Sequence, residues 1–230
     1  MRKKGFMFFV GREKETKTII RALEDGRNVI LRGLFGIGRT ALARHVAEVV
    51  GGRWTFHFVD FSRTPREMCG ALALELQKHS KSKKRWEPMR YKSERYRVLH
   101  GNLADNKNHV IVFDNVAKLT HAKISMLRLF AEERRFQTIT IIEHFIKESD
   151  EVLLRSMMMP SDIVSVGYLN RIETRLLVRM MAKKRRLKWD EQRIGMLAGS
   201  VRGYPLGIVD HVTGRTTNMA RKNANGLEGE

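Results

Sequence analysis

The sequence of 230 residues is poor in cysteine, in acidic residues and in long apolar runs. Cys69 is the only cysteine, which excludes a disulfide within the chain and favours a reducing compartment such as the cytoplasm. No apolar run approaches the roughly 18 residues that a membrane-spanning helix needs, so we expect no membrane-spanning helix and favour partners other than a membrane. Basic and then apolar residues open the chain, but Gly11-Arg-Glu13 ends that short run, which argues against a signal peptide.

The scarcity of acidic side chains leaves a strongly basic chain. Lys and Arg number 44 against 25 Asp and Glu, which gives a formal net charge of +19. Such a balance favours a polyanionic partner, and nucleic acid is the first candidate. A generally basic surface is one alternative, and an acidic protein or an anionic membrane is another. Hydrophobic residues make up 42% of the chain, enough for the core of one α/β domain with a small appended subdomain.

The central motif is the glycine-rich stretch Gly33-Leu-Phe-Gly-Ile-Gly-Arg-Thr40, which lies between an apolar run and an amphipathic segment. A strand, a loop and a helix are therefore predicted, with the spacing of the phosphate-binding loop G-x-x-x-x-G-K-[ST]. Glycines permit positive φ, so that successive N–H groups can surround a phosphate at the start of the helix. The alternative is a glycine turn without a ligand. The candidate phosphate-binding residues are Gly33, Gly36, Ile37, Gly38, Arg39, Thr40 and Ala41, and the Thr40 hydroxyl is a candidate Mg²⁺ ligand.

Asp114 is the second candidate metal-holding and catalytic residue. It follows the apolar residues 110–113, a pattern typical of a strand buried on both faces. An acidic residue at the end of such a strand, beside a phosphate loop, holds Mg²⁺ in nucleotide sites. The alternative is a simple strand-end cap. Asn115 follows, and an amide can orient water but cannot accept its proton. Arg39 replaces the usual lysine and Asn115 the usual glutamate, so we expect nucleotide binding to persist in weakened form and hydrolysis to be reduced more strongly, leaving it weak.

Five short apolar segments alternate with helical patterns along the chain. Strands are predicted at 29–31, 55–60, 108–115, 138–142 and 163–166. Helices are predicted at 11–23, 41–50, 66–78, 121–135, 148–155, 171–186, 190–198 and 205–212. This alternation predicts an α/β fold in which a five-stranded parallel sheet has helices on both faces. Glu143 and His144 follow the fourth predicted strand, where a polar group could sense the γ-phosphate, and the alternative for His144 is a plain loop residue.

Two segments concentrate basic side chains. Residues 78–97 hold nine basic and two acidic residues with three aromatics between them, and residues 171–193 hold nine basic and three acidic residues. Basic and aromatic side chains together favour contacts with nucleic acid, while a solvated connection and a solvated helix face are the alternatives. The candidate nucleic-acid-binding residues are Lys81, Lys83, Lys84, Arg85, Lys183, Lys184, Arg185 and Arg186.

In their order along the chain these motifs resemble a P-loop ATPase of the AAA+ class. The resemblance is closest to the STAND and origin-recognition-initiator groups and to transposition helper ATPases, with degenerate Walker A (Arg39) and Walker B (Asn115) motifs. It rests on Phe9-Val-Gly-Arg-Glu13, on the glycine loop with residues 110–115, and on Gly203-Tyr-Pro-Leu206. It implies that ATP or ADP binds with Mg²⁺, that Val10, Gly11 and Arg12 border the adenine, and that Pro205 presses on the nucleotide from a helical lid.

The resemblance also implies a domain organisation and a function. Residues 1–167 would form the nucleotide-binding α/β domain and residues 168–213 the lid, while the polar tail 214–230 is expected to be disordered. The implied function is a nucleotide-gated DNA-binding regulator or assembly factor in transposition or replication. It would act as a homo-oligomeric ring or filament on DNA with a transposase or replication factor. The alternatives are a STAND-like signalling switch acting on a protein partner and a P-loop scaffold without hydrolysis.

Overall fold

The computed structural model describes residues 9–79, 90, 95, 98, 108–133 and 135–214. Within this part of the chain two compact units occur. The sheet unit holds the described residues of Glu13–Phe35 and Arg39–Val166, and the helical unit holds residues 9–12, Gly36–Gly38 and residues 167–214. The candidate residues Lys81, Lys83, Lys84 and Arg85 and the predicted tail after residue 214 lie outside the described residues.

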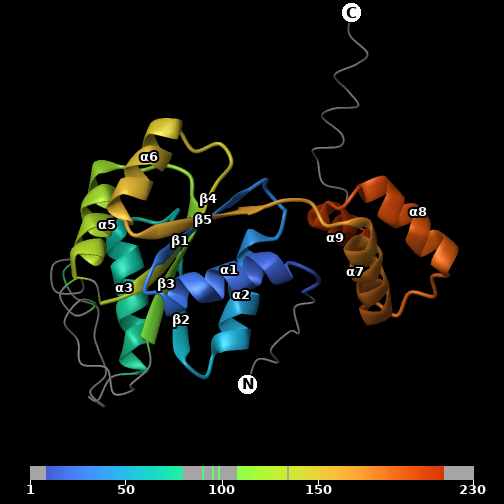
Figure 1. Ribbon diagram of the computed structural model, residues 1–230, viewed down its shortest axis with the longest axis horizontal. Coiled ribbons are helices and arrows are strands. Elements are labelled where there is room, and N and C mark those ends of the chain that lie inside the picture. The colour runs from blue at the N-terminus through green and yellow to red at the C-terminus, as the bar shows by residue number, and fades with distance from the viewer. Residues whose placement is uncertain are drawn as a thin grey trace, which may run out of the picture. The chain divides into compact units, whose positions relative to one another are not determined.

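The sheet unit is built on five parallel strands, as predicted (Figure 1). They lie in the order β2-β3-β4-β1-β5. Their bounds are β1 Asn28–Gly33, β2 Trp54–Asp60, β3 Asn108–Val116, β4 Gln137–Ile142 and β5 Ser161–Val166. Asp60, the last residue of β2, pairs in register with Asp114, which lies two residues before the end of β3. Because all strands are parallel, the polar residues that end them meet at one edge of the sheet.

Five helices are described in the sheet unit: α1 Glu13–Glu24, α2 Arg39–Val50, α3 Pro65–Gln77, α5 His121–Glu133 and α6 Glu148–Met157. Apolar residues of α3, α5 and α6 pack with strand residues such as Ile111 and Phe113 in one hydrophobic core. The helices α1 and α2 lie next to each other against another part of the sheet (Figure 1). The start of α3 is fixed by local chemistry: Pro65 is its first residue, and Thr64 and Glu67 form a reciprocal capping box.

The helical unit contains α7 Arg171–Lys184, α8 Glu191–Val201 and α9 Pro205–Thr213. Asn170 caps α7 in a capping box with Glu173, and Asp190 caps α8. The three helices enclose a small core of their own that also takes in residues outside them, made of Val10, Leu169, Leu177, Val178, Ile194, Leu197, Ala198, Ile208 and Val212. Among the described residues, no helix is long and apolar enough to cross a membrane.

Every predicted strand and helix that lies in the described residues is present, with ends that shift by a few residues. The helix predicted to reach residue 186 ends at Lys184, because Arg185 leaves the helical conformation and Arg186 has a φ of 56°. The helix predicted to end at residue 198 continues to Val201, where Arg202 stops it in the left-handed conformation. These shifts lie at helix ends and leave the order of the elements unchanged.

Candidate nucleotide-binding site

The glycine loop runs from Gly33, the last residue of β1, to Arg39, the first residue of α2. Gly36 and Gly38 have φ values of 72° and 99°, which side-chain-bearing residues rarely adopt. At Gly36 a close approach adds to this requirement. Within the helical unit a Cβ there would lie 2.7 Å from side-chain atoms of Leu206 and from the hydroxyl oxygen of Tyr204. Glycine at position 36 therefore serves both the turn and the packing of residues 204 and 206.

Thr40 and Asp114 are brought together within the sheet unit. The Thr40 hydroxyl lies 3.1 Å from Oδ1 and 3.0 Å from Oδ2 of Asp114, across 74 residues of sequence. The backbone N–H of Asn115 also donates to Asp114 Oδ1, at 3.0 Å, and so fixes the carboxylate. A hydroxyl and a carboxylate are oxygen ligands of the kind that Mg²⁺ takes together with phosphates and water. The two predicted metal-holding residues thus form a donor set that fits this ion.

Arg39 is buried, with 6% of its surface exposed, and its guanidinium is directed to the end of β4. Nη2 donates to Glu143 Oε2 at 2.8 Å, and Nη1 donates to the carbonyl oxygen of Ile142. From the sequence, Arg39 is a predicted phosphate ligand and Glu143 is a candidate sensor of the γ-phosphate. In the structure the two residues form an ion pair, in which the charge of Arg39 is balanced by that of Glu143.

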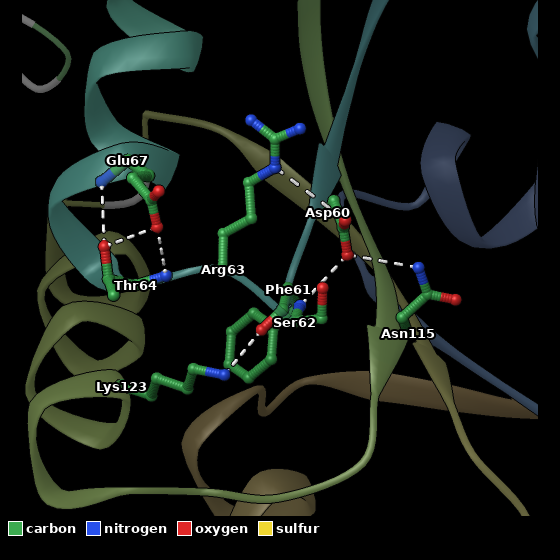
Figure 2. A network of polar contacts seen from close by, with 8 residues as sticks. All are labelled: Asp60, Phe61, Ser62, Arg63, Thr64, Glu67, Asn115 and Lys123. Atoms are coloured by element: carbon green, nitrogen blue, oxygen red, sulfur yellow. Dashed lines mark hydrogen bonds and ion pairs between the residues drawn. The ribbon is translucent and has the colours of Figure 1, made fainter.

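Asn115 lies in a polar network at the ends of β2 and β3 (Figure 2). It has a φ of 63°, a conformation that asparagine tolerates, and its Nδ2 donates to Asp60 Oδ1 at 3.1 Å. Asp60 also accepts the backbone N–H of Ser62 at 3.0 Å. The hydrogen bond from Asn115, followed by the contact with Ser62, holds the pKa of the Asp60 carboxyl below its usual value of 3.8. The amide predicted to orient water is therefore bonded to a carboxylate.

Lys123 of α5 completes this network (Figure 2). Its Nζ donates to the carbonyl oxygen of Phe61 at 2.6 Å and lies 4.7 Å from the centre of the Phe61 ring. Burial lowers the pKa of Lys123, and the charge of Asp60 acts in the opposite direction. Sequence reasoning did not single out Asp60 or Lys123. The sequence does hold a signal for Asp60, because it is an acidic residue at the end of a predicted strand. In the structure that strand, β2, pairs with β3, which contains Asp114.

The candidate adenine-side residues belong to the helical unit. Val10 lies in its core, and Arg12 is buried with 7% of its surface exposed. Arg12 Nη2 donates to the carbonyl oxygen of Ile37 at 3.4 Å and to that of Gly167. A Cβ on Gly11 would overlap the side chain of Glu173, so only glycine fits there without a shift. Arg12 thus holds the segment 10–12 against Ile37 of the glycine loop. The other candidate on the adenine side, Pro205, is the first residue of α9 and directly follows Tyr204.

Four candidate nucleic-acid-binding residues are described, and all four are exposed at the C-terminal end of α7. Lys183 and Lys184 lie in the last turn of the helix, and Arg185 and Arg186 follow it. Basic side chains are favoured at this position by the partial negative charge of a helix C-terminus. This cluster, Lys183–Lys184–Arg185–Arg186, is called the α7 basic cluster below.

A five-stranded parallel sheet, a glycine loop between β1 and α2, and the Thr40–Asp114 pair define the class: a P-loop NTPase fold of the AAA+ kind. Residues 28–190, well over half of the chain, match the AAA domain family in its dynein-related subfamily. The chain belongs to this family. Among the curated proteins, none matches the sequence significantly.

Several solved structures share the fold at low sequence identity. The RuvB Holliday junction branch migration motor of Thermotoga maritima has a TM-score of 0.57 and 17% identity, over 89% of this chain and 61% of RuvB. The Aeropyrum pernix ORC1 protein, solved in complex with DNA, has a TM-score of 0.55 and 15% identity, over 85% and 61% of the two chains. A STAND protein with a tetratricopeptide repeat sensor from Pyrococcus horikoshii has a TM-score of 0.54 and 17% identity, over 96% and 33%. This chain therefore spans about three fifths of RuvB and of ORC1.

Proposed function

We propose that this chain binds ATP or ADP together with Mg²⁺ at the glycine loop and hydrolyses ATP only weakly. The observation that carries the proposal is the meeting of Thr40 and Asp114, 3.0 Å apart, beside the end of the loop. Membership of the AAA domain family supports it. Backbone N–H groups of the loop and the start of α2 would receive the phosphates. Val10, Gly11, Arg12 and Pro205 keep the adenine-side roles that the resemblance implies.

In this proposal Thr40, Asp114 and Asn115 of the sheet unit have different roles. Thr40 and Asp114 would hold Mg²⁺, which when bound supplies charge stabilisation for the phosphates. Asp114 is kept in place by the N–H of Asn115. Asn115 has no group that accepts a proton from water, and its amide is occupied by Asp60, which is why we expect slow hydrolysis.

The test is calorimetric titration of ATP with Mg²⁺ into the wild-type chain and into Thr40→Ala. We expect micromolar binding by the wild type and a loss of at least about tenfold in the variant, because an oxygen ligand of the ion is removed. Thr18→Ala is the matched control, since the Thr18 hydroxyl bonds to the Lys14 carbonyl on the exposed face of α1. No binding by the wild type, or equal losses in Thr40→Ala and Thr18→Ala, would contradict the proposal.

We further propose that the bound nucleotide gates DNA binding, and that the chain works as an oligomeric regulator or assembly factor in transposition or replication. The net charge of +19 and the exposed α7 basic cluster support DNA binding. Two proteins of similar fold are described as a Holliday junction motor and as a complex with DNA, which is in keeping with this proposal. Negative-stain imaging with duplex DNA should show rings or filaments only when ATP or a slow analogue is present.

A STAND-like signalling switch is the second candidate function. The similar fold of the Pyrococcus horikoshii STAND protein, which covers 96% of this chain, favours it. Such a switch would bind nucleotide tightly, hydrolyse it slowly and act on a protein partner. A chain that copurifies with nucleotide, stays monomeric and ignores DNA at low salt would support the switch and would contradict the DNA-binding function.

A further inference from the structure

The Arg39–Glu143 ion pair is buried in the sheet unit, and the proposed function gives Glu143 no role. Only 6% of Arg39 and 8% of Glu143 is exposed, and the charged atoms are 2.8 Å apart. Arg39 occupies the loop position at which a lysine normally reaches the β- and γ-phosphates. In this chain the cation at that position is bound to a carboxylate of its own sheet.

Glu143 is held firmly at the end of β4. Its N–H donates to the carbonyl oxygen of Val116 at 2.8 Å, and its own carbonyl accepts the N–H of Ile146 at 3.1 Å. Its strand pairs with β1 on one side and with β3 on the other. The backbone of Glu143 is therefore held at the end of a strand that lies between β1, which leads into the glycine loop, and β3, which contains Asp114.

A guanidinium binds carboxylates and phosphates through the same planar fork of N–H donors. The contacts to Glu143 and to the Ile142 carbonyl use both terminal nitrogens of Arg39. Phosphates at this loop would thus have to displace Glu143 from Arg39, or would meet a pair whose net charge is zero. We propose that Glu143 determines how tightly the loop binds polyphosphates by competing with them for Arg39, an inference that rests on the proposed nucleotide binding.

The alternative role of this pair is a structural strut between α2 and β4. The two roles differ for Glu143→Gln, which keeps the volume of the side chain and an acceptor oxygen for Arg39 but removes the charge. A strut that loses its charge lowers stability and leaves nucleotide affinity unchanged or lower. A competitor that loses its charge releases Arg39 to the phosphates and raises the affinity.

The experiment is calorimetric titration of the full chain with ATP and Mg²⁺, and separately with AMP. For Glu143→Gln we expect ATP affinity to rise by about tenfold or more, the size expected when a charge-assisted hydrogen bond is exchanged. AMP affinity should stay the same, because AMP has no β- or γ-phosphate. Glu151→Gln is the matched control and should behave as the wild type, since Glu151 of α6 pairs with Arg32 and its replacement removes the same charge from the same unit.

The variant Arg39→Met/Glu143→Gln separates competition from simple charge repulsion. Both charges of the pair are then absent, so ATP affinity should return to within about threefold of the wild type. An affinity as high as that of Glu143→Gln would show that Arg39 takes no part, and would overturn the inference. If circular dichroism shows that Glu143→Gln does not fold, Glu143→Asn makes the same comparison with a shorter amide.

The remaining outcomes distinguish the role of Glu143 from nucleotide binding itself. Wild-type binding with no gain in Glu143→Gln would overturn the role of Glu143 and leave nucleotide binding standing. Absence of ATP binding in the wild type and in every variant would overturn the proposed function itself, and the inference with it. Binding by Glu143→Gln alone would contradict nucleotide binding by the wild-type chain, and it would still support competition by Glu143, because the wild-type site would then be blocked by its own carboxylate.

Discussion

Asn115 and Asp60 form a hydrogen bond between an amide and a carboxylate beside Asp114. The residue after Asp114 is usually the carboxylate that activates water, and here it is an amide that donates to a carboxylate on the neighbouring strand. Asn115 adopts a left-handed conformation at this point, with a φ of 63°. Position 115 therefore supplies no carboxylate to activate water, which is the physical basis of the slow hydrolysis proposed above.

Exchanging the two side chains should therefore restore hydrolysis. We predict that Asp60→Asn/Asn115→Glu raises the rate of ATP hydrolysis by roughly 10²-fold, the lower range for an added general base. Phosphate release under saturating ATP and Mg²⁺ measures the rate. The single variant Asn115→Glu should gain less, because the introduced carboxylate would face the carboxylate of Asp60. A double variant no faster than the wild type would show that the missing carboxylate does not limit the reaction.

A pH prediction follows from the same hydrogen bond. Because Asn115 is the largest cause of the lowered pKa of Asp60, Asn115→Ala should raise that pKa toward 3.8, which an NMR titration of the carboxyl carbon measures. A carboxyl whose folded pKa lies below its unfolded pKa stabilises the fold above the unfolded pKa. That contribution disappears as the pH falls through the folded pKa. The variant should therefore lose stability at neutral pH and converge with the wild type in acid.

Glu67 is the internal control for that titration. The hydrogen bonds from Thr64 lower the pKa of Glu67, and none of its causes involves Asn115. An Asn115→Ala chain in which both carboxyls move together would indicate a general change of the fold rather than the loss of one hydrogen bond.

Among the secondary-structure elements, α7 depends on chemistry at its first turn. Asn170 accepts the N–H of Glu173 at 2.9 Å, and the Asn170 N–H donates to the Glu173 carboxylate at 2.7 Å. We predict that Asn170→Ala lowers the free energy of unfolding by about 1 kcal/mol, as measured in urea. Asn170→Ser keeps an acceptor and should lose only a few tenths of that. Equal losses in the two variants would mean that the cap is not what fixes this helix.

The elements could be predicted from the sequence because each one has a local signal. The residues of β3 just before Asp114 are an unbroken apolar run. Pro65 and the capping box of Thr64 and Glu67 indicate the start of α3. Helix ends were less certain, as at Lys184, because the C-terminal turn depends on the conformation of the residues beyond it. The parallel pairing of the strands also follows from their alternation with helices, whereas their order β2-β3-β4-β1-β5 does not.

The contacts within the candidate site could be predicted only in part. That Thr40 and Asp114 would lie near each other follows from the motif and from the parallel sheet. The partner of Arg39 does not follow, because Glu143 lies 104 residues away and spacing says nothing about the direction of an arginine side chain. The same holds for Asn115 and Asp60, whose hydrogen bond depends on the left-handed backbone at Asn115.

For the whole molecule the dominant property is its charge. A net charge of +19 attracts polyanions from any direction, so the charge by itself does not locate a DNA-binding surface. In the part of the chain that the structure describes, the α7 basic cluster stands out because four basic residues follow one another at the end of one helix and all are exposed. A surface that follows a DNA backbone neutralises several neighbouring phosphates at once.

The salt dependence of DNA binding separates that cluster from the general charge. Each phosphate contact on duplex DNA contributes about 0.9 to the slope of log affinity against log salt, so changing Lys183, Lys184, Arg185 and Arg186 to Gln should reduce the slope by about 3 to 4. Fluorescence anisotropy with labelled duplex between about 50 and 200 mM salt measures it. The charge-matched control changes four exposed basic residues of the sheet unit, Lys14, Lys17, Arg21 and Arg128, and should leave the slope nearly unchanged. Equal reductions in the two variants would mean that the DNA senses only the total charge of the molecule.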